Sequence, residues 1–323
     1  MNGYGHRFNE GMRWLRRIAI VVFIALGAVA AVVVVFALLL PSDATKHVLE
    51  VRGRFGGVEE ITARMDAQSS VRHIALRNHR GEVVTNAWVR RPRVLRSDYR
   101  IIITYAGQNT GEAILSLIKA KDDLVLMAVQ YPWTPPHTAI GKLRTPYDIR
   151  QAAYRTVAGG MLAVDELAEH EHLDTNRIVL MGASLGSIFA TIHGAMDQRV
   201  PLVVLVHGGT DLSAPLDAEL RERVPAWLCP AVVRLARIPI DTFNPSHYVA
   251  RIAPRKLLVI AARDDQWFPP EAVMAFFDRA RQPKELRWTN SRHVGARNRR
   301  VVDVIIAELA SYLDSPALRS QSR

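Results

Sequence analysis

The sequence predicts an α/β fold with a mostly parallel, doubly wound sheet, an antiparallel hairpin at its start and one transmembrane helix before it. Strand-like and helix-like segments alternate from residue 71 to residue 314. Several of the strand segments are short, uninterrupted apolar runs, which is typical of parallel strands that helices cover on both faces. Near the N-terminus, residues 18–40 carry no charged side chain. These three observations fix the fold class that we expect.

Residues 18–40 have the length and composition of a transmembrane helix. As a helix, these 23 residues would rise about 34 Å, slightly more than the hydrocarbon core of about 30 Å. A cleaved signal peptide ending near Ser42-Asp43-Ala44 is the alternative. However, the apolar part of a signal peptide is shorter, at roughly 7–15 residues. We therefore expect an uncleaved membrane anchor.

The charges beside this segment predict its orientation. Residues 1–17 hold four arginines directly before the apolar run, and the next basic residues after it are more distant. By the positive-inside rule, residues 1–17 should be cytoplasmic. The rest of the chain should then be extracytoplasmic, in the periplasm of a cell that has one.

The segments after the membrane helix are assigned in chain order. Residues 41–70 form a polar linker that Gly53, Gly56 and Gly57 should loosen. An antiparallel hairpin comes next, with strands at 71–77 and 82–89. Six further strands are expected at 99–105, 124–130, 177–181, 201–206, 256–262 and 285–289, and helices at 111–120, 147–170, 185–196, 270–281 and 299–313. The domain should therefore span residues 71–314, with a small cap inserted at 210–254 and a tail at 315–323.

Composition excludes several classes of protein. The single cysteine, Cys229, rules out an intramolecular disulfide and a cysteine-based zinc cluster. The net charge is +11, but the basic surplus is scattered and no nucleic-acid-binding motif accompanies it. We therefore expect no nucleic acid partner. The surplus is better suited to a weak attraction toward anionic lipid headgroups.

The strongest motif is Gly182-Ala183-Ser184-Leu185-Gly186, a G-x-S-x-G sequence. By itself the motif is weak, but it directly follows an apolar strand and opens a helix. A turn this sharp forces its central residue into a strained backbone conformation and exposes the hydroxyl at the carboxyl edge of the sheet. Open α/β sheets bind ligands at this edge. Ser184 is therefore the candidate nucleophile.

A serine hydroxyl needs a base, and that base needs an orienting acid. In this arrangement the acid and then the histidine follow the serine along the chain. Asp265 lies on the loop after a buried strand, four residues before Pro269. Asp264 is the near competitor, and Asp211 is a weaker one. Among the eleven histidines, only His293 follows the acid loop, and it precedes the last helix.

Two further features of the sheet edge concern the substrate. Backbone N–H groups of Leu185 and Gln108 are the candidates for an oxyanion hole, because both follow a strand end near the nucleophile. His207, in a His-Gly-Gly sequence at a strand end, is interpreted as structural. Aromatic and proline residues near the edge are candidates to wall an apolar pocket, with about half of them in ordinary packing: Trp133, Pro135, Pro136, Trp227, Trp267 and Phe268.

Together, Gly107-Gln108, the motif around Ser184, Asp265 and His293 resemble the α/β-hydrolase superfamily over about residues 71–314. Within it, the chain looks similar to the dienelactone hydrolase, acetyl xylan esterase and prolyl oligopeptidase groups. The similarity lies in the long helix at 147–170 and in the segment 173–178, Leu-Asp-Thr-Asn-Arg-Ile, which leads into the motif around Ser184. Ala262 replaces a glycine that the acid loop of the superfamily usually has. No β-propeller precedes the domain, so we do not expect the architecture of prolyl oligopeptidase itself.

The resemblance implies a serine hydrolase with a Ser184–His293–Asp265 triad, no metal and no cofactor. A carboxylic ester of small size is the expected substrate. A thioesterase or a serine peptidase of the same fold is the alternative among enzymes. The alternative outside enzymes is a catalytically inactive, membrane-tethered binding module. The sequence leaves the oligomeric state open.

Overall fold

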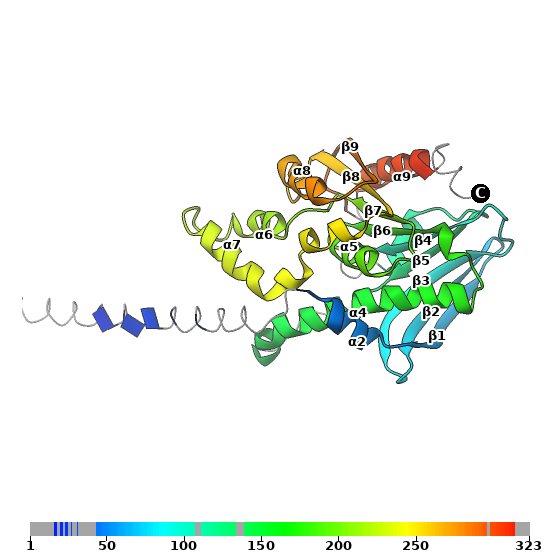
Figure 1. Ribbon diagram of the computed structural model, residues 1–323, viewed down its shortest axis with the longest axis horizontal. Helices are drawn as coiled ribbons and strands as arrows, with labels where there is room; N and C mark the ends of the chain where they lie inside the picture. The colour runs from blue at the N-terminus through cyan, green and yellow to red at the C-terminus, as the bar shows by residue number, and fades with distance from the viewer. Residues whose placement is uncertain are drawn as a thin grey trace, which may run out of the picture.

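The computed structural model of the chain contains one nine-stranded sheet with helices on both faces (Figure 1). It describes residues 43–106, 111–133, 139–295 and 298–313, together with a few isolated residues between 16 and 31. The strands follow the order β1-β2-β3-β5-β4-β6-β7-β8-β9. The sheet is therefore mixed, with an antiparallel start and a parallel remainder, as the sequence predicts.

The antiparallel part comprises β1 (Phe55–Met65), β2 (Ser69–Asn78) and β3 (Val83–Pro92). β2 and β3 form the predicted hairpin, and β3 also pairs antiparallel with β5. This region begins the folded domain well before residue 71.

The prediction of a linker over residues 41–70 is wrong, because these residues hold helix α2 (Thr45–Arg52) and strand β1. The helix is fixed to the domain at its start, where the Ala44 N–H donates to the Tyr248 hydroxyl at 2.6 Å and Ala44 is fully buried. β1 pairs with β2 through two register shifts, one next to Gly57, whose φ is +102°, and one between Glu60 and Thr62. Its side chains are mostly exposed, as expected of an edge strand, so the strand lacks the alternating apolar pattern of the others.

The parallel part supplies the apolar runs that the sequence predicts. The strands are β4 (Arg100–Tyr105), β5 (Leu124–Val129), β6 (Ile178–Ala183), β7 (Leu202–Val206), β8 (Lys256–Asp264) and β9 (Lys284–Arg292). Most side chains in β4 to β8 are buried, since helices cover both faces, whereas the edge strand β9 is mostly half-buried. All pairings among these six strands are parallel, so their carboxyl ends meet at one edge.

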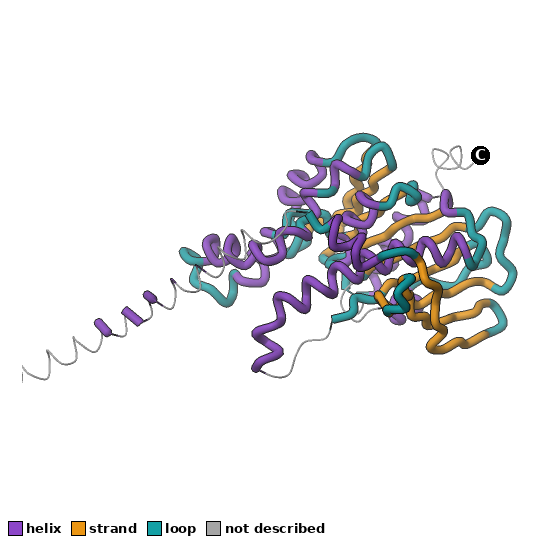
Figure 2. The backbone as a smooth tube through the Cα atoms, turned by 60° about the horizontal axis from the view of Figure 1, so that its bottom comes forward, coloured by secondary structure: helices purple, strands orange, loops and turns teal. Residues whose placement is uncertain are grey.

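Two layers of helices enclose the sheet (Figures 1 and 2). One face packs against α4 (Ala139–Glu169), α5 (Gly186–Met196), α8 (Pro270–Arg279) and α2. The opposite face packs against α3 (Gly111–Leu117) and α9 (Arg299–Leu313). The long helix starts at Ala139, earlier than the predicted residue 147, and continues through Pro146. A short 3₁₀ helix, Thr175–Arg177, leads into β6.

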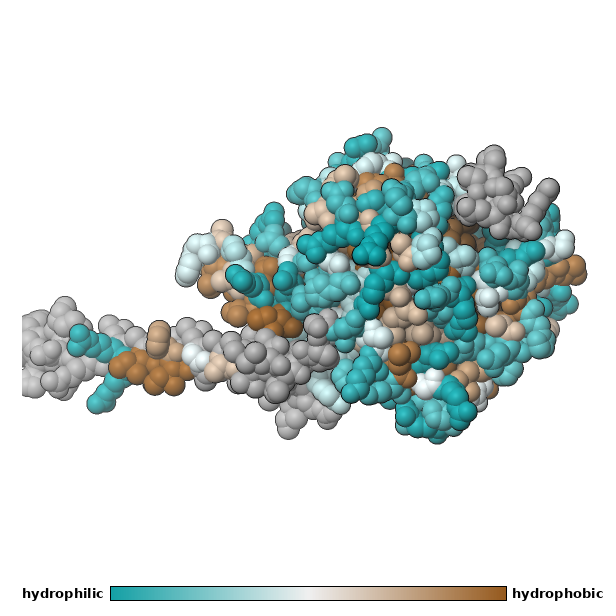
Figure 3. Space-filling model, in the orientation of Figure 1, coloured by the Kyte–Doolittle hydropathy of each residue, from teal (hydrophilic) through white to brown (hydrophobic). Residues whose placement is uncertain are grey.

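Residues 210–254 form a small helical insertion between β7 and β8, as expected for a cap of one or two helices. The insertion contains α6 (Ser213–Leu220), α7 (Cys229–Arg237) and three 3₁₀ helices, Ile238–Phe243, Pro245–His247 and Val249–Arg251. Its outer part carries an apolar surface patch, seen in brown over α6 and α7 in Figure 3. The exposed apolar side chains of this part of the cap include Leu228 and Leu235, and Trp227 between the two helices has 82% of its surface exposed.

Among the described residues, no helix combines the length and the apolar run that crossing a bilayer requires. Most of residues 18–40 lie outside the described residues, as do residues 1–15 and the tail at 315–323. The predicted anchor and the segment before it therefore fall largely outside the described part of the chain.

Candidate active site

The turn that carries Ser184 has the geometry that the motif predicts. β6 ends at Ala183 and α5 begins at Gly186, so Ser184 stands between them with a positive φ of 53°. A Cβ on Gly182 would lie 2.4 Å from the Gly186 carbonyl oxygen, and a Cβ on Gly186 would lie 2.2 Å from that of Tyr105. Only glycine fits at both positions. The strained backbone aims the hydroxyl out of the sheet edge.

The His293 ring contacts the serine hydroxyl. This residue directly follows β9, and its Nε2 lies 2.8 Å from Ser184 Oγ. The Phe268 ring stacks on the imidazole at a centroid distance of 5.4 Å and an interplanar angle of 26°. Carboxyl-edge loops of two parallel strands, β6 and β9, therefore bring together residues that are 109 positions apart.

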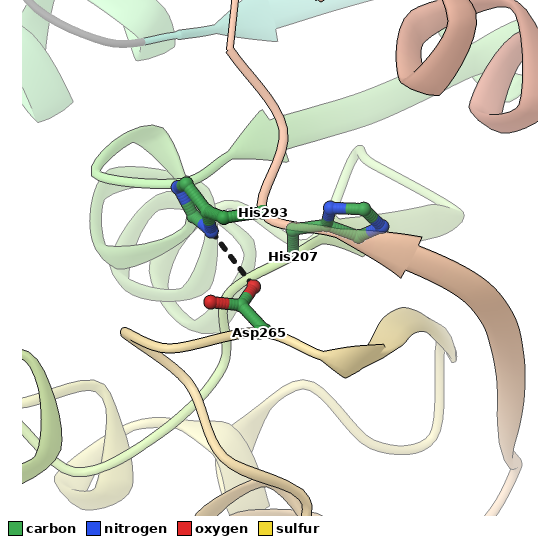
Figure 4. A group of neighbouring side chains, drawn as sticks. All are labelled: His207, Asp265 and His293. Atoms are coloured by element: carbon green, nitrogen blue, oxygen red, sulfur yellow. Dashed lines mark hydrogen bonds and ion pairs between the residues drawn. The ribbon is translucent and has the colours of Figure 1, made fainter.

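Asp265 orients this imidazole. Its Oδ2 lies 2.7 Å from His293 Nδ1 (Figure 4). Its Oδ1 accepts hydrogen bonds from the backbone N–H groups of Trp267 and Phe268, at 2.9 and 3.1 Å. The carboxylate is fully buried, so its position is fixed by these three bonds.

The two competing aspartates lie elsewhere. Asp264 is the last residue of β8, and its side chain is exposed. Asp211 belongs to the cap and accepts hydrogen bonds from Ser213, Arg237 and Asn244. Burial raises the pKa of the Asp211 carboxyl, but these hydrogen bonds and the arginine charge outweigh it and lower the pKa to about 2. Of the three candidate acids, the structure brings only Asp265 to His293.

His207 is a buried neighbour of this group of residues (Figure 4). It follows β7 with a positive φ of 45°, and its Nε2 lies 3.2 Å from Thr289 Oγ1. Its ring centroid is 6.2 Å from that of His293. Burial, with a further contribution from the His293 charge, lowers the pKa of His207 to about 4 in spite of the Asp265 carboxylate. His207 is therefore neutral near pH 7. The sequence placed this residue at the same edge but gave no sign of its burial.

Within the described part of the chain, one group of side chains is close enough to hold a metal ion. Ligand atoms of His207, Asp265 and His293 lie within 4.8 Å of one another. However, Asp265 and His293 already bond to each other, and His293 also bonds to Ser184. A metal ion would have to break these bonds. The arrangement is better suited to moving a proton from the hydroxyl to the imidazole.

The predicted oxyanion donors are described only in part. The Leu185 backbone is helical and lies between Ser184 and the first residue of α5, where N–H groups of a helix lack intrahelical partners. Gln108, the second predicted donor, lies outside the described residues, as does Gly107.

An apolar cavity of about 190 Å³ opens beside Ser184, between α3 and α9. None of the aromatic and proline residues predicted from the sequence as pocket walls is among its described lining residues. Trp227 is on the outer surface of the cap, Trp267 packs against the core of the opposite face, and Pro135 and Pro136 lie outside the described residues. The lining residues are Thr104, Ala106, Ile114, Leu117, Ile118, Met181, Ala183, Ser184, Val206, Val294, Gly295, Val302, Ile305, Ile306 and Leu309.

Comparisons with known proteins agree with this architecture. The sequence model of the prolyl oligopeptidase family matches residues 149–315, which include the turn around Ser184, Asp265 and His293. None of the curated proteins matches the chain.

Three solved structures share the fold at low sequence identity. Acetyl xylan esterase 1 from Thermoanaerobacterium sp. JW/SL YS485 superposes with a TM-score of 0.60 and 16% identity, over 83% of this chain and 92% of its own. Acetyl xylan esterase from Paenibacillus sp. R4 gives 0.58 and 15%, over 82% and 92%. A hypothetical protein from Pseudomonas aeruginosa gives 0.54 and 15%, over 78% and 95%. At these identities, the likeness establishes the α/β-hydrolase fold.

Proposed function

This chain belongs to the prolyl oligopeptidase family, and we propose that it is a serine hydrolase that cleaves carboxylic esters through an acyl-enzyme intermediate. One observation carries the proposal, namely the continuous hydrogen-bond path from Ser184 Oγ through both nitrogens of His293 to the Asp265 carboxylate. A nucleophile, a base and an orienting acid at these distances form the arrangement that acyl transfer requires.

In the first step, Ser184 Oγ attacks the ester carbonyl carbon while His293 Nε2 takes the hydroxyl proton. The Asp265 carboxylate stabilises the resulting imidazolium and holds its Nδ1–H in the correct orientation. The Leu185 N–H, which directly follows the nucleophile along the chain, would donate to the developing oxyanion. The tetrahedral intermediate then expels the alcohol, which receives the proton from His293.

In the second step, water attacks the acyl carbon and His293 Nε2 takes its proton. Collapse of this intermediate breaks the bond to Ser184 Oγ, returns the proton to that oxygen and releases the carboxylic acid. His207 remains neutral throughout, because burial holds its pKa at about 4. It therefore adds no positive charge that would oppose formation of the imidazolium 6.2 Å away.

Two alternative functions use the same residues differently. A thioesterase or a serine peptidase would use the same path with another leaving group. The cavity beside Ser184 disfavours a peptide with its amide groups, because among the described lining residues only Thr104 and Ser184 carry polar side chains. An ester and a thioester would present the same acyl chain to this cavity, so an assay of both substrates distinguishes them. A catalytically inactive binding module would show no turnover that depends on Ser184.

Hydrolysis of p-nitrophenyl butyrate by the purified protein tests the proposal. Ser184→Ala should lower kcat by about 10⁴-fold or more, and Asp265→Asn by about 10⁴-fold. Asp264→Asn is the matched control and should stay within about twofold of the wild type, because Asp264 is exposed and lies outside the hydrogen-bond path. A thioester and a prolyl p-nitroanilide are assayed in parallel to distinguish the alternatives. Full activity in Ser184→Ala, or equal losses in the two aspartate variants, would overturn the proposal.

We also propose membrane anchoring through residues 18–40, with the hydrolase domain outside the cytoplasm. The described apolar residues of this segment support it, because Ile20, Val21, Phe23 and Ile24 each expose more than half of their surface. If the proposal is right, carbonate washing leaves the full chain in the membrane fraction and detergent releases it. Recovery of the full chain in the carbonate supernatant would contradict an anchor.

A further inference from the structure

The cavity beside Ser184 lies on the α3/α9 face of the sheet. Its floor consists of strand residues whose side chains alternate toward this face, such as Thr104 on β4, Met181 and Ala183 on β6, and Val206 on β7. Side chains of α3 and α9 form its walls. Because Ser184 itself belongs to the lining, an acyl group bonded to its Oγ can extend into this cavity.

The direction of the cavity follows from the topology. β6 runs toward Ser184, so Met181 lies three residues, about 10 Å, behind the nucleophile along the strand. α9 follows the carboxyl edge of β9 and runs back along the sheet. Its lining residues extend from Val302 to Leu309, which is also about 10 Å along the helix. The cavity therefore extends from Ser184 and Val294 toward Met181 and Leu309, and we call the part near Met181 and Leu309 its deep end.

The chemistry of the lining selects an unbranched apolar group. None of the described lining residues is charged, and the walls are formed by isoleucine, leucine, valine and methionine side chains. An apolar cavity of about 150 Å³ in another protein stays dry and binds benzene, a molecule of six carbons. A cavity of about 190 Å³ should therefore accept about six to eight carbons.

The acyl chain is better suited to this space than the leaving alcohol. The alcohol must depart and water must replace it before the second step, whereas the acyl group remains on Ser184 throughout. An apolar cavity behind the nucleophile can retain a chain but offers almost no polar partner to hold an attacking water molecule. The alcohol should therefore leave on the other side of Ser184.

We infer that the substrates are esters of unbranched, medium-chain fatty acids, whose acyl chain of about six to eight carbons lies between α3 and α9. This inference rests on the proposed esterase function and adds the acyl specificity to it. Each methylene that enters the cavity should raise kcat/KM about fourfold, up to the length at which the cavity is full.

The experiment measures kcat/KM for p-nitrophenyl acetate, butyrate, hexanoate, octanoate and dodecanoate. For the wild-type full chain, we expect a rise of about 250-fold from butyrate to octanoate, which is about fourfold for each of four methylenes, and no further gain at dodecanoate. Leu309→Trp fills the deep end and should lower the value for octanoate about thirtyfold, with less than a twofold change for acetate. The matched control is Val304→Trp on the same helix, at a position 43% exposed and outside the lining, which should retain the wild-type profile.

A second variant and a second measurement make the test independent of how one variant folds. Ile118→Trp narrows the cavity from α3 and should produce the same loss on octanoate. In wild-type protein, an octyl fluorophosphonate should inactivate at least tenfold faster than its methyl analogue.

Each outcome has a definite meaning. If hydrolysis depends on Ser184 but acetate is the best substrate, the acyl-specificity inference is wrong and the proposed function stands. The inference is equally wrong if Val304→Trp and Leu309→Trp change the profile alike. If no ester is hydrolysed and neither fluorophosphonate reacts with folded protein, the proposed function itself fails.

Discussion

Helices α4 and α5 lie close against one face of the sheet, whereas α3 and α9 leave a cavity of about 190 Å³ on the other. Glycines make the close approach possible. On α4, a Cβ on Gly159 would lie 2.0 Å from a Thr85 methyl group, and a Cβ on Gly160 would lie 1.5 Å from the Tyr105 hydroxyl. On α5, a Cβ on Gly194 would lie 2.6 Å from a Val203 methyl group. On the α3/α9 face, isoleucine, leucine and valine side chains border the cavity instead.

The packed face also contains a buried polar network. The Tyr105 hydroxyl lies 2.9 Å from His193 Nδ1, and His193 Nε2 lies 3.6 Å from the Asp197 carboxylate, which also bonds to Arg199. Burial alone would raise the pKa of Asp197, but the nearby His193 imidazole and the hydrogen bonds from Arg199 hold it far below its usual range. Tyr105 ends β4, beside the turn of Ser184. The comparison teaches that the α4/α5 face supplies rigidity for the nucleophile, while the α3/α9 face supplies room for a ligand.

The largest contrast between the faces should appear on adding one methyl group. Gly160→Ala places a Cβ 1.5 Å from the hydroxyl of a fully buried tyrosine, and we expect a loss of about 4 kcal/mol or more in the free energy of unfolding. Gly111→Ala on α3 is the matched control, because its Cβ would meet the movable Gln130 side chain at 2.9 Å. Urea denaturation measures both. Equal losses would refute the difference between the faces.

Truncating a leucine should also cost more stability on the α4/α5 face than on the α3/α9 face, by a smaller margin than the glycine substitutions. Leu162 of α4 is fully buried in the packed core, so Leu162→Ala should cost about 4 kcal/mol. Leu309→Ala should cost about 2 kcal/mol, because Leu309 already borders a cavity and has fewer neighbours to lose. Urea midpoints of both variants provide the test. A greater loss for Leu309→Ala would contradict it.

His207, at the edge between the faces, should make stability depend on pH. Its pKa is about 4 in the folded protein and about 6.5 when unfolded, so the unfolded state binds more protons between these values. The contribution is fully present above pH 6.5 and is lost as the pH falls toward 4, by at most about 3 kcal/mol. Urea denaturation at pH 7 and 5 should show a steeper loss for wild type than for His207→Asn, in which asparagine tolerates the positive φ. Identical losses would show that His207 does not titrate in this way.

Removing one polar atom from each face should give the smallest effects, with opposite signs. Thr104 and Tyr105 are neighbours on β4 whose side chains point to opposite faces. Tyr105→Phe leaves His193 Nδ1 without its partner and should cost about 1–3 kcal/mol. Thr104→Val removes a buried hydroxyl that has no hydrogen-bond partner among the described residues, so stability should be unchanged or rise slightly. Thermal denaturation of both variants measures the sign of each change in stability. A shared sign would contradict the comparison.

Much of this architecture could be predicted from local sequence. The apolar runs of β4 to β8 are continuous, so their burial was readable, and the order of Ser184, Asp265 and His293 followed from loops at successive strand ends. The competition between Asp264 and Asp265 could not be decided in this way. It depends on which carboxylate faces inward at the end of β8, and that is a property of the folded loop.

Other features could not be predicted, because they depend on contacts between segments that are distant in the sequence and produce no local sequence pattern. The cavity lies between α3 and α9, which are separated by nearly two hundred residues, and its volume depends on how closely both approach the sheet. β1 was missed because an exposed edge strand does not need alternating apolar residues, and because its glycines resemble those of a loop. The burial of His207 likewise arises only when β7, β8 and β9 come together.

The most direct test of the central claim is to locate the residue that becomes covalently modified when the folded protein reacts with an alkyl fluorophosphonate. Peptide mass spectrometry of the wild type should find one adduct, on Ser184. Its formation should slow by several orders of magnitude in His293→Ala, because the imidazole 2.8 Å from the hydroxyl is the activating base. An adduct on another residue, or equal labelling of Ser184→Ala, would contradict the account.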